Sequence, residues 1–367
     1  MEQNVLKDFL KAAAGGGLPA VRRFIAAGAD VNAADDEGAT ALMLATERGN
    51  TKTDLAIIRL LLDGGANVRA ADNIGSTALT RAVSKGHTGT ARLLLEHGAD
   101  VNAASKKGIT ALMHAACNGH VDTARLLIEH GADVNAADGE GATALLWAAI
   151  NGHLDECIAI ARLLIEHGAD VDAANNEGTS ALIRAALRDH TGFARLLLEH
   201  GADVNAASKK GFTALMFAAP QGHTARLLLE RGADPSAAIP CSVSALNYAA
   251  MEGATAAVGL LLDGSADTRA ANKNGSTALL LAASLGHIDT VLRLLERGAS
   301  VNAADVDGET ALMRAAKNGC AETAELLIDK GADVNAADRH GNTALSLAKE
   351  KGHTVTIKLL RAAGAKE

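Results

Sequence analysis

The stretch ARLLLEHGADVNAASKKG occupies residues 91–108, and the same eighteen letters return unchanged at residues 194–211. A shorter motif, xxxGxTAL with small variations, occurs far more often than this long one. Its occurrences begin at Asp35, Asp72, Ser105, Asp138, Asn175, Ser208, Ile239, Asn272, Asp305 and Asp338. Successive starts are separated by 33 residues in most cases and by 31 or 37 in the others. Such a period indicates a stack of repeated units rather than one large globule.

Residues 105–137 illustrate how one repeat is expected to fold. Thr110 is a good helix N-cap, because its hydroxyl can accept a hydrogen bond from a free backbone N–H at the start of a helix. Gly119 supplies a left-handed stop to this first helix. A second helix is predicted over residues 123–130 and ends at Gly131. The residues that follow are predicted to form an extended excursion with a tight turn, that is, a β-hairpin loop.

This pattern of a turn and two antiparallel helices in 33 residues resembles the ankyrin repeat. The resemblance rests on the motifs DxxGxTAL, AAxxGH and LLLEHGADVNA, and it covers nearly the whole chain. It implies an all-α solenoid of ankyrin-type repeats, stacked into a curved array with a concave binding face. One departure is consistent, because the family's usual TPLH reads TALM, TALT or TALL here. Alanine lacks the preset φ of proline but is a good helix former, so the expected fold is unchanged.

The repeats are expected to lie between two caps. Residues 1–34 are predicted to be an N-terminal capping repeat, and residues 338–367 a C-terminal capping repeat, because stacked repeats need polar ends. Nine internal ankyrin-like repeats fill residues 35–337. They group into three copies of a three-repeat block, at residues 35–137, 138–238 and 239–337. The 103-residue step between the two identical stretches is one such block, whose first repeat carries an extra turn before its second helix.

Composition and charge exclude several classes of function. Hydrophobic residues make up 48% of the chain but aromatic residues only 2%, so small side chains carry the core. The formal net charge of −8 and the dispersed basic residues argue against nucleic acid and anionic membranes as partners. No apolar run approaches the ~20 residues of a membrane helix, and the first ten residues lack the features of a secretory signal. We therefore expect a cytoplasmic monomer.

Histidines and cysteines do not indicate a catalytic or metal site. Most of the 13 histidines recur at two fixed positions of the repeat, and only His114 and His340 lie elsewhere. The four cysteines are widely separated and include no CxxC pair. The aspartates of the GAD motif, such as Asp100, are expected to accept hydrogen bonds from hairpin amides. With no nucleophile elbow or phosphate loop, the sequence predicts no enzyme activity, no cofactor and no metal.

Variation between repeats is more informative, because departures from the shared pattern occur where the stack does not dictate the residue. The second residue after the leucine of TAL should point along the first helix toward the concave face. In chain order this row of residues reads Leu44, Arg81, His114, Trp147, Arg184, Phe217, Tyr248, Leu281, Arg314 and Leu347. The chain's one Trp, its one Tyr and one of its five Phe occupy this single row.

The central repeats are therefore predicted to present an apolar and aromatic groove that binds another protein. Trp, Tyr and Arg often dominate interface energetics, and exposed apolar patches mark binding sites. The predicted partner-binding residues are Arg81, His114, Trp147, Ile150, Arg184, Leu187, Arg188, Phe212, Phe217, Tyr248, Met251 and Leu281, with Lys106, Lys107, Lys209 and Lys210 at the rim. Arg184 and Arg188 are expected to pair with carboxylates of the partner. The alternative is that the large side chains merely fill gaps between repeats.

A second irregularity adjoins this groove. Three of the four prolines, Pro220, Pro235 and Pro240, lie close together, and Ser242 stands where other repeats have glycine. Proline donates no backbone hydrogen bond, and serine disfavours positive φ. The hairpin over residues 235–243 is therefore predicted to be distorted, either as a shaped recognition site or as a decaying repeat.

Three other functions stay open. The chain could inhibit a partner enzyme in the manner of an immunity protein, by blocking its active site with the hairpin tips that carry the lysine pairs. The resemblance also allows a substrate of an asparagine-modifying hydroxylase, with Asn102, Asn135 and Asn205 as the candidate residues. The third is a structural spacer without a ligand. The irregular repeats argue against a designed, consensus-type protein.

Overall fold

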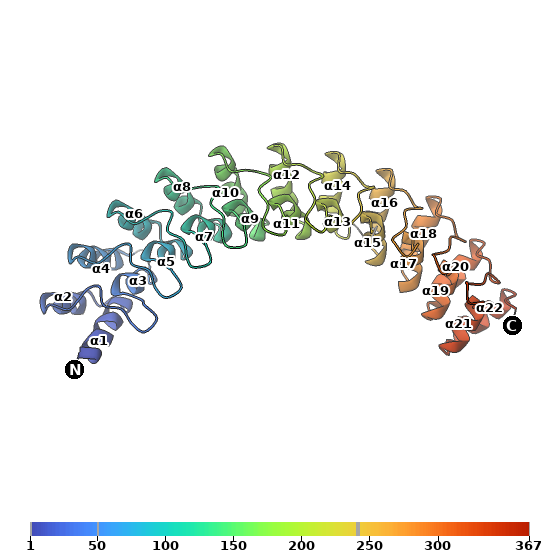
Figure 1. Ribbon diagram of the computed structural model, residues 1–367, viewed down its shortest axis with the longest axis horizontal. Coiled ribbons are helices and arrows are strands. Elements are labelled where there is room, and N and C mark those ends of the chain that lie inside the picture. Colours follow the sequence, from blue (N-terminus) through green and yellow to red (C-terminus); the bar gives the residue numbers. More distant parts are fainter. Residues whose placement is uncertain (1, 50, 240–242, 367) are drawn as a thin grey trace. The chain divides into compact units, whose positions relative to one another are not determined.

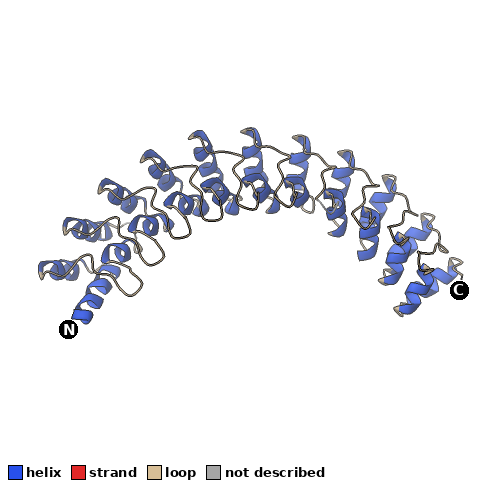
Figure 2. Cartoon of the chain, viewed as in Figure 1, coloured by secondary structure: helices blue, strands red, loops and turns tan. Residues whose placement is uncertain are grey.

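A computed structural model describes residues 2–49, 51–239 and 243–366 of the chain. Within these ranges the chain consists of helices and loops, and its extended segments make isolated β-bridges only (Figure 2). The chain folds as two compact units. Residues 1–176 with 199–202 form the first unit, and residues 177–198 with 203–367 form the second.

The first unit is built of consecutive helix pairs (Figure 1). Its helices are α1 (Glu2–Ala14), α2 (Leu18–Ala26), α3 (Ala41–Thr46), α4 (Lys52–Asp63), α5 (Ala78–Ser84), α6 (Thr88–Glu96), α7 (Ala111–Asn118), α8 (Val121–Glu129), α9 (Ala144–Ala148), the 3-10 helix η1 (Ala149–Asn151) and α10 (Asp155–Glu166). Each odd-numbered helix packs on the next odd-numbered one, and each even-numbered helix on the next even-numbered one. The odd-numbered helices, which come first in each repeat, therefore form one layer and the even-numbered helices the other.

The second unit continues the same scheme. Its helices are α11 (Ala181–Leu187), α12 (Thr191–Glu199), α13 (Ala214–Ala218), α14 (His223–Glu230), α15 (Ala245–Met251), α16 (Thr255–Asp263), α17 (Ala278–Leu285), α18 (Ile288–Glu296), α19 (Ala311–Lys317), α20 (Ala321–Asp329), α21 (Ala344–Glu350) and α22 (Thr354–Ala362). Helices α11 to α21 again pack in odd-numbered succession. The all-α repeat fold expected from the sequence is confirmed.

The start and stop signals of the helices act as the sequence predicts. Thr110 adopts extended backbone, and its hydroxyl accepts the Met113 N–H at 3.4 Å, which caps α7. Gly119 ends α7 in the left-handed region with φ 73°. The second helix begins at Val121, two residues before the predicted position, because the His120 carbonyl already accepts the Ala124 N–H at 2.9 Å.

Small side chains let neighbouring repeats approach closely. In α7, Ala111, Ala115 and Ala116 are fully buried, and Leu112 is 1% exposed. These residues face α5 and α9, the first helices of the adjacent repeats. A single repeat cannot cover both sides of this helix, so much of the core forms between repeats as well as between the two helices of each repeat.

The four-residue insertions, predicted to form an extra turn before the second helix, become part of that helix. Helices α4 and α10 each span 12 residues, whereas α6 and α8 span nine. In α4 the new first turn carries its own capping box, in which Thr51 and Asp54 satisfy each other's backbone N–H groups.

The two-residue deletion in the repeat that begins at Ser208 has a compensating residue in the preceding repeat. Helix α14 begins at His223 without a side-chain cap from its own repeat. Asp189 provides an acceptor from the preceding repeat, because its Oδ1 accepts the Thr224 N–H at 3.0 Å and its Oδ2 lies 3.2 Å from His223 Nδ1. Asp189 occupies the left-handed region with φ 54°, where most repeats have glycine.

Two series of hydrogen bonds join successive hairpins. In the first, a backbone N–H at most of the described hairpin tips donates to the preceding tip. Lys106 N–H donates to Ile74 O at 2.9 Å, and Lys209 N–H donates to Glu177 O at 2.9 Å. The residue at the corresponding place in the Ile239 repeat is Pro240, which has no N–H to donate. This series therefore lacks one donor, because the backbone nitrogen of proline carries no hydrogen.

The second series is formed by asparagine side chains, here called the asparagine ladder. Asn135 Nδ2 donates to Gly168 O at 2.9 Å, and its Oδ1 accepts the Asp170 N–H at 2.9 Å. The other members of the ladder are Asn32, Asn102, Asn205, Asn302 and Asn335. Ser236 occupies the ladder position in its repeat, but its hydroxyl donates to Asp234 within the same turn.

The hairpin predicted to be distorted keeps its stem. Ala238 and Ser244 form the same antiparallel bridge that other repeats make, and Ile239 N–H donates to Val243 O at 3.2 Å. Residues 240–242, which include Pro240 and Ser242, lie outside the described residues. The predicted distortion at the tip of this hairpin stays a prediction.

Asn135→Ala should lower the free energy of unfolding by about 1–2 kcal/mol, because it removes two hydrogen bonds between adjacent repeats. Ser236→Ala is the matched control, since the Ser236 side chain bonds within its own turn. Urea denaturation followed by circular dichroism measures both variants. An equal loss in the two variants would contradict the role of the ladder.

Candidate functional site

The row of residues predicted to face a partner lies at the surface of the first-helix layer. The side chains from Leu44 to Arg314 are half-buried, and each is flanked along its helix by buried alanine or leucine. Leu347, the last of the row, is 5% exposed and belongs to the core. The side chains from Leu44 to Arg314 are therefore partly accessible to solvent, and the rest of each side chain packs within the first-helix layer.

The predicted groove residues are divided between the two units. Arg81, His114, Trp147 and Ile150 lie in the first unit. The second unit contains Arg184, Leu187, Arg188, Phe212, Phe217, Tyr248, Met251 and Leu281. The two groups form two separate candidate surfaces.

Arg81, predicted to contact a partner, is held by carboxylates of its own chain. One Nη donates to Asp72 Oδ2 at 2.6 Å, and the other pairs with Glu47. Burial raises the Asp72 pKa, but hydrogen bonds from Arg81 and from the Ser76 and Ile74 N–H groups outweigh it, so the pKa lies below its ordinary value. Arg81 is thus a structural tie between successive repeats.

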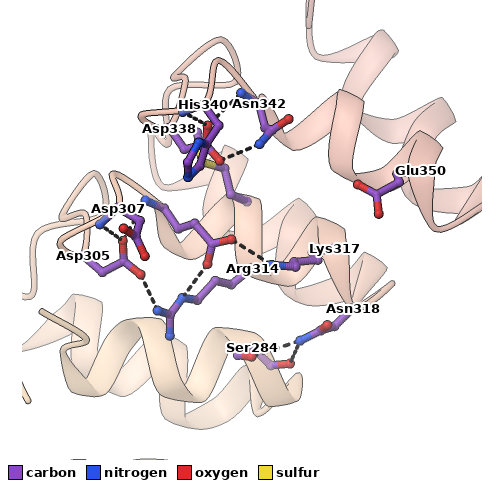
Figure 3. A network of polar contacts seen from close by, with 12 residues as sticks. Ser284, Asp305, Asp307, Arg314, Lys317, Asn318, Asp338, His340, Asn342 and Glu350 are labelled. Carbon is purple, nitrogen blue, oxygen red and sulfur yellow. Dashed lines mark hydrogen bonds and ion pairs between the residues drawn. The ribbon is translucent and has the colours of Figure 1, made fainter. Parts of the chain in front are cut away.

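Arg314, at the same row position, is held in the same way (Figure 3). It pairs with Asp305, and its Nε lies 3.4 Å from Glu309 Oε2. Lys317 Nζ donates to the other Glu309 oxygen at 2.9 Å, and this bond raises the Lys317 pKa. Arg314 also donates to Ser276 of the preceding repeat at 2.9 Å.

Trp147 uses the polar edge of its ring within the protein. The indole Nε1 donates to Asp138 Oδ2 at 3.0 Å, and the ring meets His114 edge-on with centroids 6.2 Å apart. Burial lowers the His114 pKa. Both residues are half-buried, and so is Ile150 in η1, one turn after Trp147. What Trp147 and His114 can offer a partner is therefore an apolar ring surface.

The second unit presents the larger apolar surface. Phe212 on the hairpin arm stacks on Phe217 of α13 with ring centroids 5.2 Å apart, and both are half-buried. Large apolar side chains are exposed at the C-terminal ends of three first helices. They are Leu187 in α11, Met251 in α15 and Leu285 in α17, at 45%, 38% and 55% exposure.

Tyr248 and Leu281, also predicted to line the groove, are half-buried one turn before Met251 and Leu285. We define the second-unit patch as Leu187, Phe212, Phe217, Tyr248, Met251, Leu281 and Leu285. It joins aromatic rings of the row to exposed apolar side chains at the helix ends.

The lysine pairs lie on the hairpin tips. Lys106, Lys107, Lys209 and Lys210 are exposed, and they pair with no carboxylate within the described part of the chain. In the first unit they border a hollow of about 480 Å³, whose lining includes Arg81, His114, Lys106, Lys107, Ile109 and Ile74. The lining of this hollow combines cationic and apolar side chains.

A metal-binding group is not found among residues 2–49, 51–239 and 243–366. No group of three or more His, Cys, Asp or Glu side chains in these ranges could hold a metal ion. Several histidines at the two recurring positions of the repeat bond to backbone carbonyls. His130 Nδ1 lies 2.8 Å from Leu126 O, and His87 Nδ1 lies 2.9 Å from Thr46 O, whereas His223 contacts Asp189. Burial raises the pKa of Cys117, Cys157 and Cys320, which is the opposite of activation.

The candidate modification sites are the asparagines of the ladder. Asn102, Asn135 and Asn205 each use both ends of the side-chain amide to join the next hairpin. The GAD aspartates accept hairpin amides as predicted, with Asp100 Oδ1 3.0 Å from Asn102 N. The geometry thus gives these asparagines a structural role.

Family comparison agrees with the fold. A family model described as ankyrin repeats (three copies) matches the chain at residues 9–105, 103–175, 155–239, 238–305 and 297–366. The chain belongs to the ankyrin repeat family. Ankyrin repeats are protein–protein interaction modules and are typically not enzymes. A comparison with curated proteins finds no match. In the described ranges, no helix of this ankyrin repeat protein is long and apolar enough to cross a membrane.

Sequence reasoning missed the carboxylates that bind several row side chains of the ankyrin repeats. Asp72, Asp138 and Asp305 each lie nine residues before the row residue that they bind. The signal was available, since each of these aspartates is the first residue of its repeat. An acidic residue at that place should have been read as a partner for Arg or Trp in the row.

Asp72→Asn should destabilise the protein by about 2 kcal/mol at pH 7, because it removes the negative charge beside a half-buried guanidinium. Since folding lowers the Asp72 pKa, this advantage is complete above about pH 4 and is lost as the pH falls through the folded-state pKa. Urea midpoints of the wild type and the variant from pH 7 to pH 2.5 test this. Asp36→Asn, at an exposed aspartate, is the control. A stability difference that stays constant down to pH 2.5 would argue against the ion pair.

Cys157 should resist iodoacetamide at pH 8 in the native protein. Burial, with smaller contributions from Cys117 and Glu156, raises its pKa to about 11, so about one thiol in a thousand is ionised. Mass spectrometry after a short reaction measures the labelling, with protein in urea as the positive control. Rapid labelling of native Cys157 would show that the site is open to solvent.

Proposed function

We propose that this protein is a non-enzymatic scaffold that captures another protein through the first-helix side of its central repeats. The observation that carries the proposal is the second-unit patch. Leu187, Met251 and Leu285 are exposed at equivalent helix ends in three repeats of one unit. Exposed apolar groups arranged in this way are a feature of protein-binding surfaces.

The aromatic residues support this proposal by their position. Phe217 and Tyr248 lie one turn before the exposed helix ends, and Phe212 extends the apolar surface onto the hairpin arm. Their inner edges pack in the layer, so the rings are held in place before binding. Rigid aromatic side chains lose little conformational freedom when a partner covers them.

In the first unit, Trp147 with His114 is proposed as a second, smaller contact. The hydrogen bond from the indole to Asp138 fixes the orientation of the ring. The ring face, rather than its N–H, is the part that would meet a partner.

Binding through the hairpin tips is the rival mode, and it is favoured by the exposed lysine pairs. A tip-binding inhibitor would depend on Lys106, Lys107, Lys209 and Lys210, and only weakly on the aromatic row. Charge reversal at the four lysines therefore separates the two modes.

Phe217→Ala/Tyr248→Ala should weaken capture of the native partner at least tenfold, because truncating central aromatic residues of an interface typically costs 1 kcal/mol or more for each. Trp147→Ala is tested separately, since it reports on the first unit. Val355→Ser, which changes an exposed apolar residue of α22, is the matched control. Affinity capture from the native source, quantified by mass spectrometry, measures recovery.

Recovery of the same partner by wild type and by both aromatic variants would reject binding through the row. If recovery fails only after charge reversal of the four lysines, binding occurs at the hairpin tips. Circular dichroism of each variant shows that the repeats remain folded.

A further inference from the structure

The duplicated block allows a comparison of two equivalent arginines. The identical stretches 91–108 and 194–211 fix an offset of 103 residues, which places Arg184 at the position of Arg81. The two carboxylates that hold Arg81 are those of Asp72 and Glu47. At the same offset, Asp72 corresponds to Asn175 and Glu47 corresponds to Ile150. The second copy has therefore lost both acidic partners and kept the arginine.

The structure agrees with this reading of the sequence. Arg184 pairs with no carboxylate within residues 2–49, 51–239 and 243–366, whereas Arg81 and Arg314 do. The buried Nε atoms of all three arginines lack a hydrogen-bond acceptor, so the difference lies in the carboxylates. Arg314 resembles Arg81 in having two acidic partners, Asp305 and Glu309. A half-buried guanidinium without a counter-charge has lost part of its hydration with little compensation. An incoming carboxylate would provide that compensation.

The surroundings of Arg184 favour an anion over a cation. Arg188, one turn later at the end of α11, is exposed. The next hairpin carries exposed Lys209 and Lys210, and it is joined to the hairpin of the Arg184 repeat through Lys209 N–H and Glu177 O. Asp170, Asp172 and Asp203 precede the hairpin tips, where Glu177 is the acidic residue and Lys209 and Lys210 are the basic ones.

Apolar groups adjoin the same arginine. Leu187, 45% exposed, lies one turn beyond Arg184 on α11. Phe217 occupies the same row position on α13, which packs directly against α11. A ligand that reaches Arg184 therefore also touches apolar side chains of the second-unit patch.

We propose that a carboxylate of the partner protein pairs with Arg184. The bound segment places an Asp or Glu side chain on this guanidinium and an adjacent apolar or aromatic side chain on the second-unit patch. This inference rests on the proposed function and names the chemistry of the partner. A carboxylate can bind a guanidinium through two parallel hydrogen bonds, so it fixes the register of the segment as well as adding affinity.

The chain provides its own test substitution. Asn175→Asp restores the aspartate that begins the repeats at Asp35, Asp72 and Asp305, and it supplies Arg184 with an internal carboxylate. Asn272→Asp is the matched control, because it adds the same charge at the same hairpin position in a repeat whose row residue is Leu281. The Oδ1 of Asn272 accepts the Asn274 and Ser276 N–H groups at 2.9 and 3.0 Å, which an aspartate can equally accept.

The probe is a random dodecapeptide display library, selected against the full-length wild type and each variant. Wild type and Asn272→Asp should select peptides with an Asp or Glu next to an apolar or aromatic residue. The selected peptides should bind Asn175→Asp and Arg184→Gln at least tenfold more weakly by fluorescence polarisation, the loss expected for a charged hydrogen bond. Changing the peptide carboxylate to its amide should cause the same loss in wild type and little further loss in Arg184→Gln.

Equal affinity of the selected acidic peptides for wild type, Asn175→Asp and Arg184→Gln would overturn the inference. The absence of any selected family that depends on Arg184 would also overturn it. Peptides that lose affinity for Phe217→Ala/Tyr248→Ala but show no acidic preference would leave the proposed function intact and reject only the carboxylate. Selected peptides that bind the aromatic variants and wild type equally would instead reject the proposed function.

Discussion

Each repeat depends on its neighbours for the burial of its apolar side chains, and the rest of the structure follows from that constraint. Ala111, Ala115 and Ala116 of α7 are covered by the first helices on either side of them, and no part of their own repeat could replace those helices. Close approach of the helices requires small side chains. It also brings successive hairpins within hydrogen-bond distance, where the tip amides and the asparagine ladder join them.

The same constraint explains where the repeats are allowed to differ. Positions that face a neighbouring repeat are fixed by packing, whereas the row residues are anchored in the layer but reach solvent. Some of the variable row residues stabilise the stack, because Arg81 and Arg314 each bond to a side chain of the preceding repeat. The rest, in Phe217 and Tyr248, leaves ring surface that the repeats themselves do not cover. Structural ties and uncovered ring surface therefore both occur along one row.

Much of the fold could be predicted because its signals are local and repeated. A threonine N-cap and a left-handed glycine set the ends of α7 with little influence from the rest of the chain, and the extra turn of α10 follows from the length of its repeat. The predicted start of α8 was wrong by two residues, because the start depends on a carbonyl in the preceding loop. The row residues from Leu44 to Arg314 are half-buried, which is consistent with their predicted position on the outer side of the first helices. The partners of Arg81 and Trp147 were missed, because a pairing across nine residues depends on how the hairpin folds back on the helix.

The contact between Asp189 and the shortened repeat bears on how freely such units can be exchanged. Helix α14 receives its N-terminal hydrogen-bond acceptor from the preceding repeat, through a residue held in a backbone conformation that usually belongs to glycine. If the shortened repeat were moved behind a neighbour with glycine at the Asp189 position, the first turn of α14 would lose that acceptor. The shortened repeat is therefore matched to the repeat that precedes it, and the order of the two matters for the start of α14.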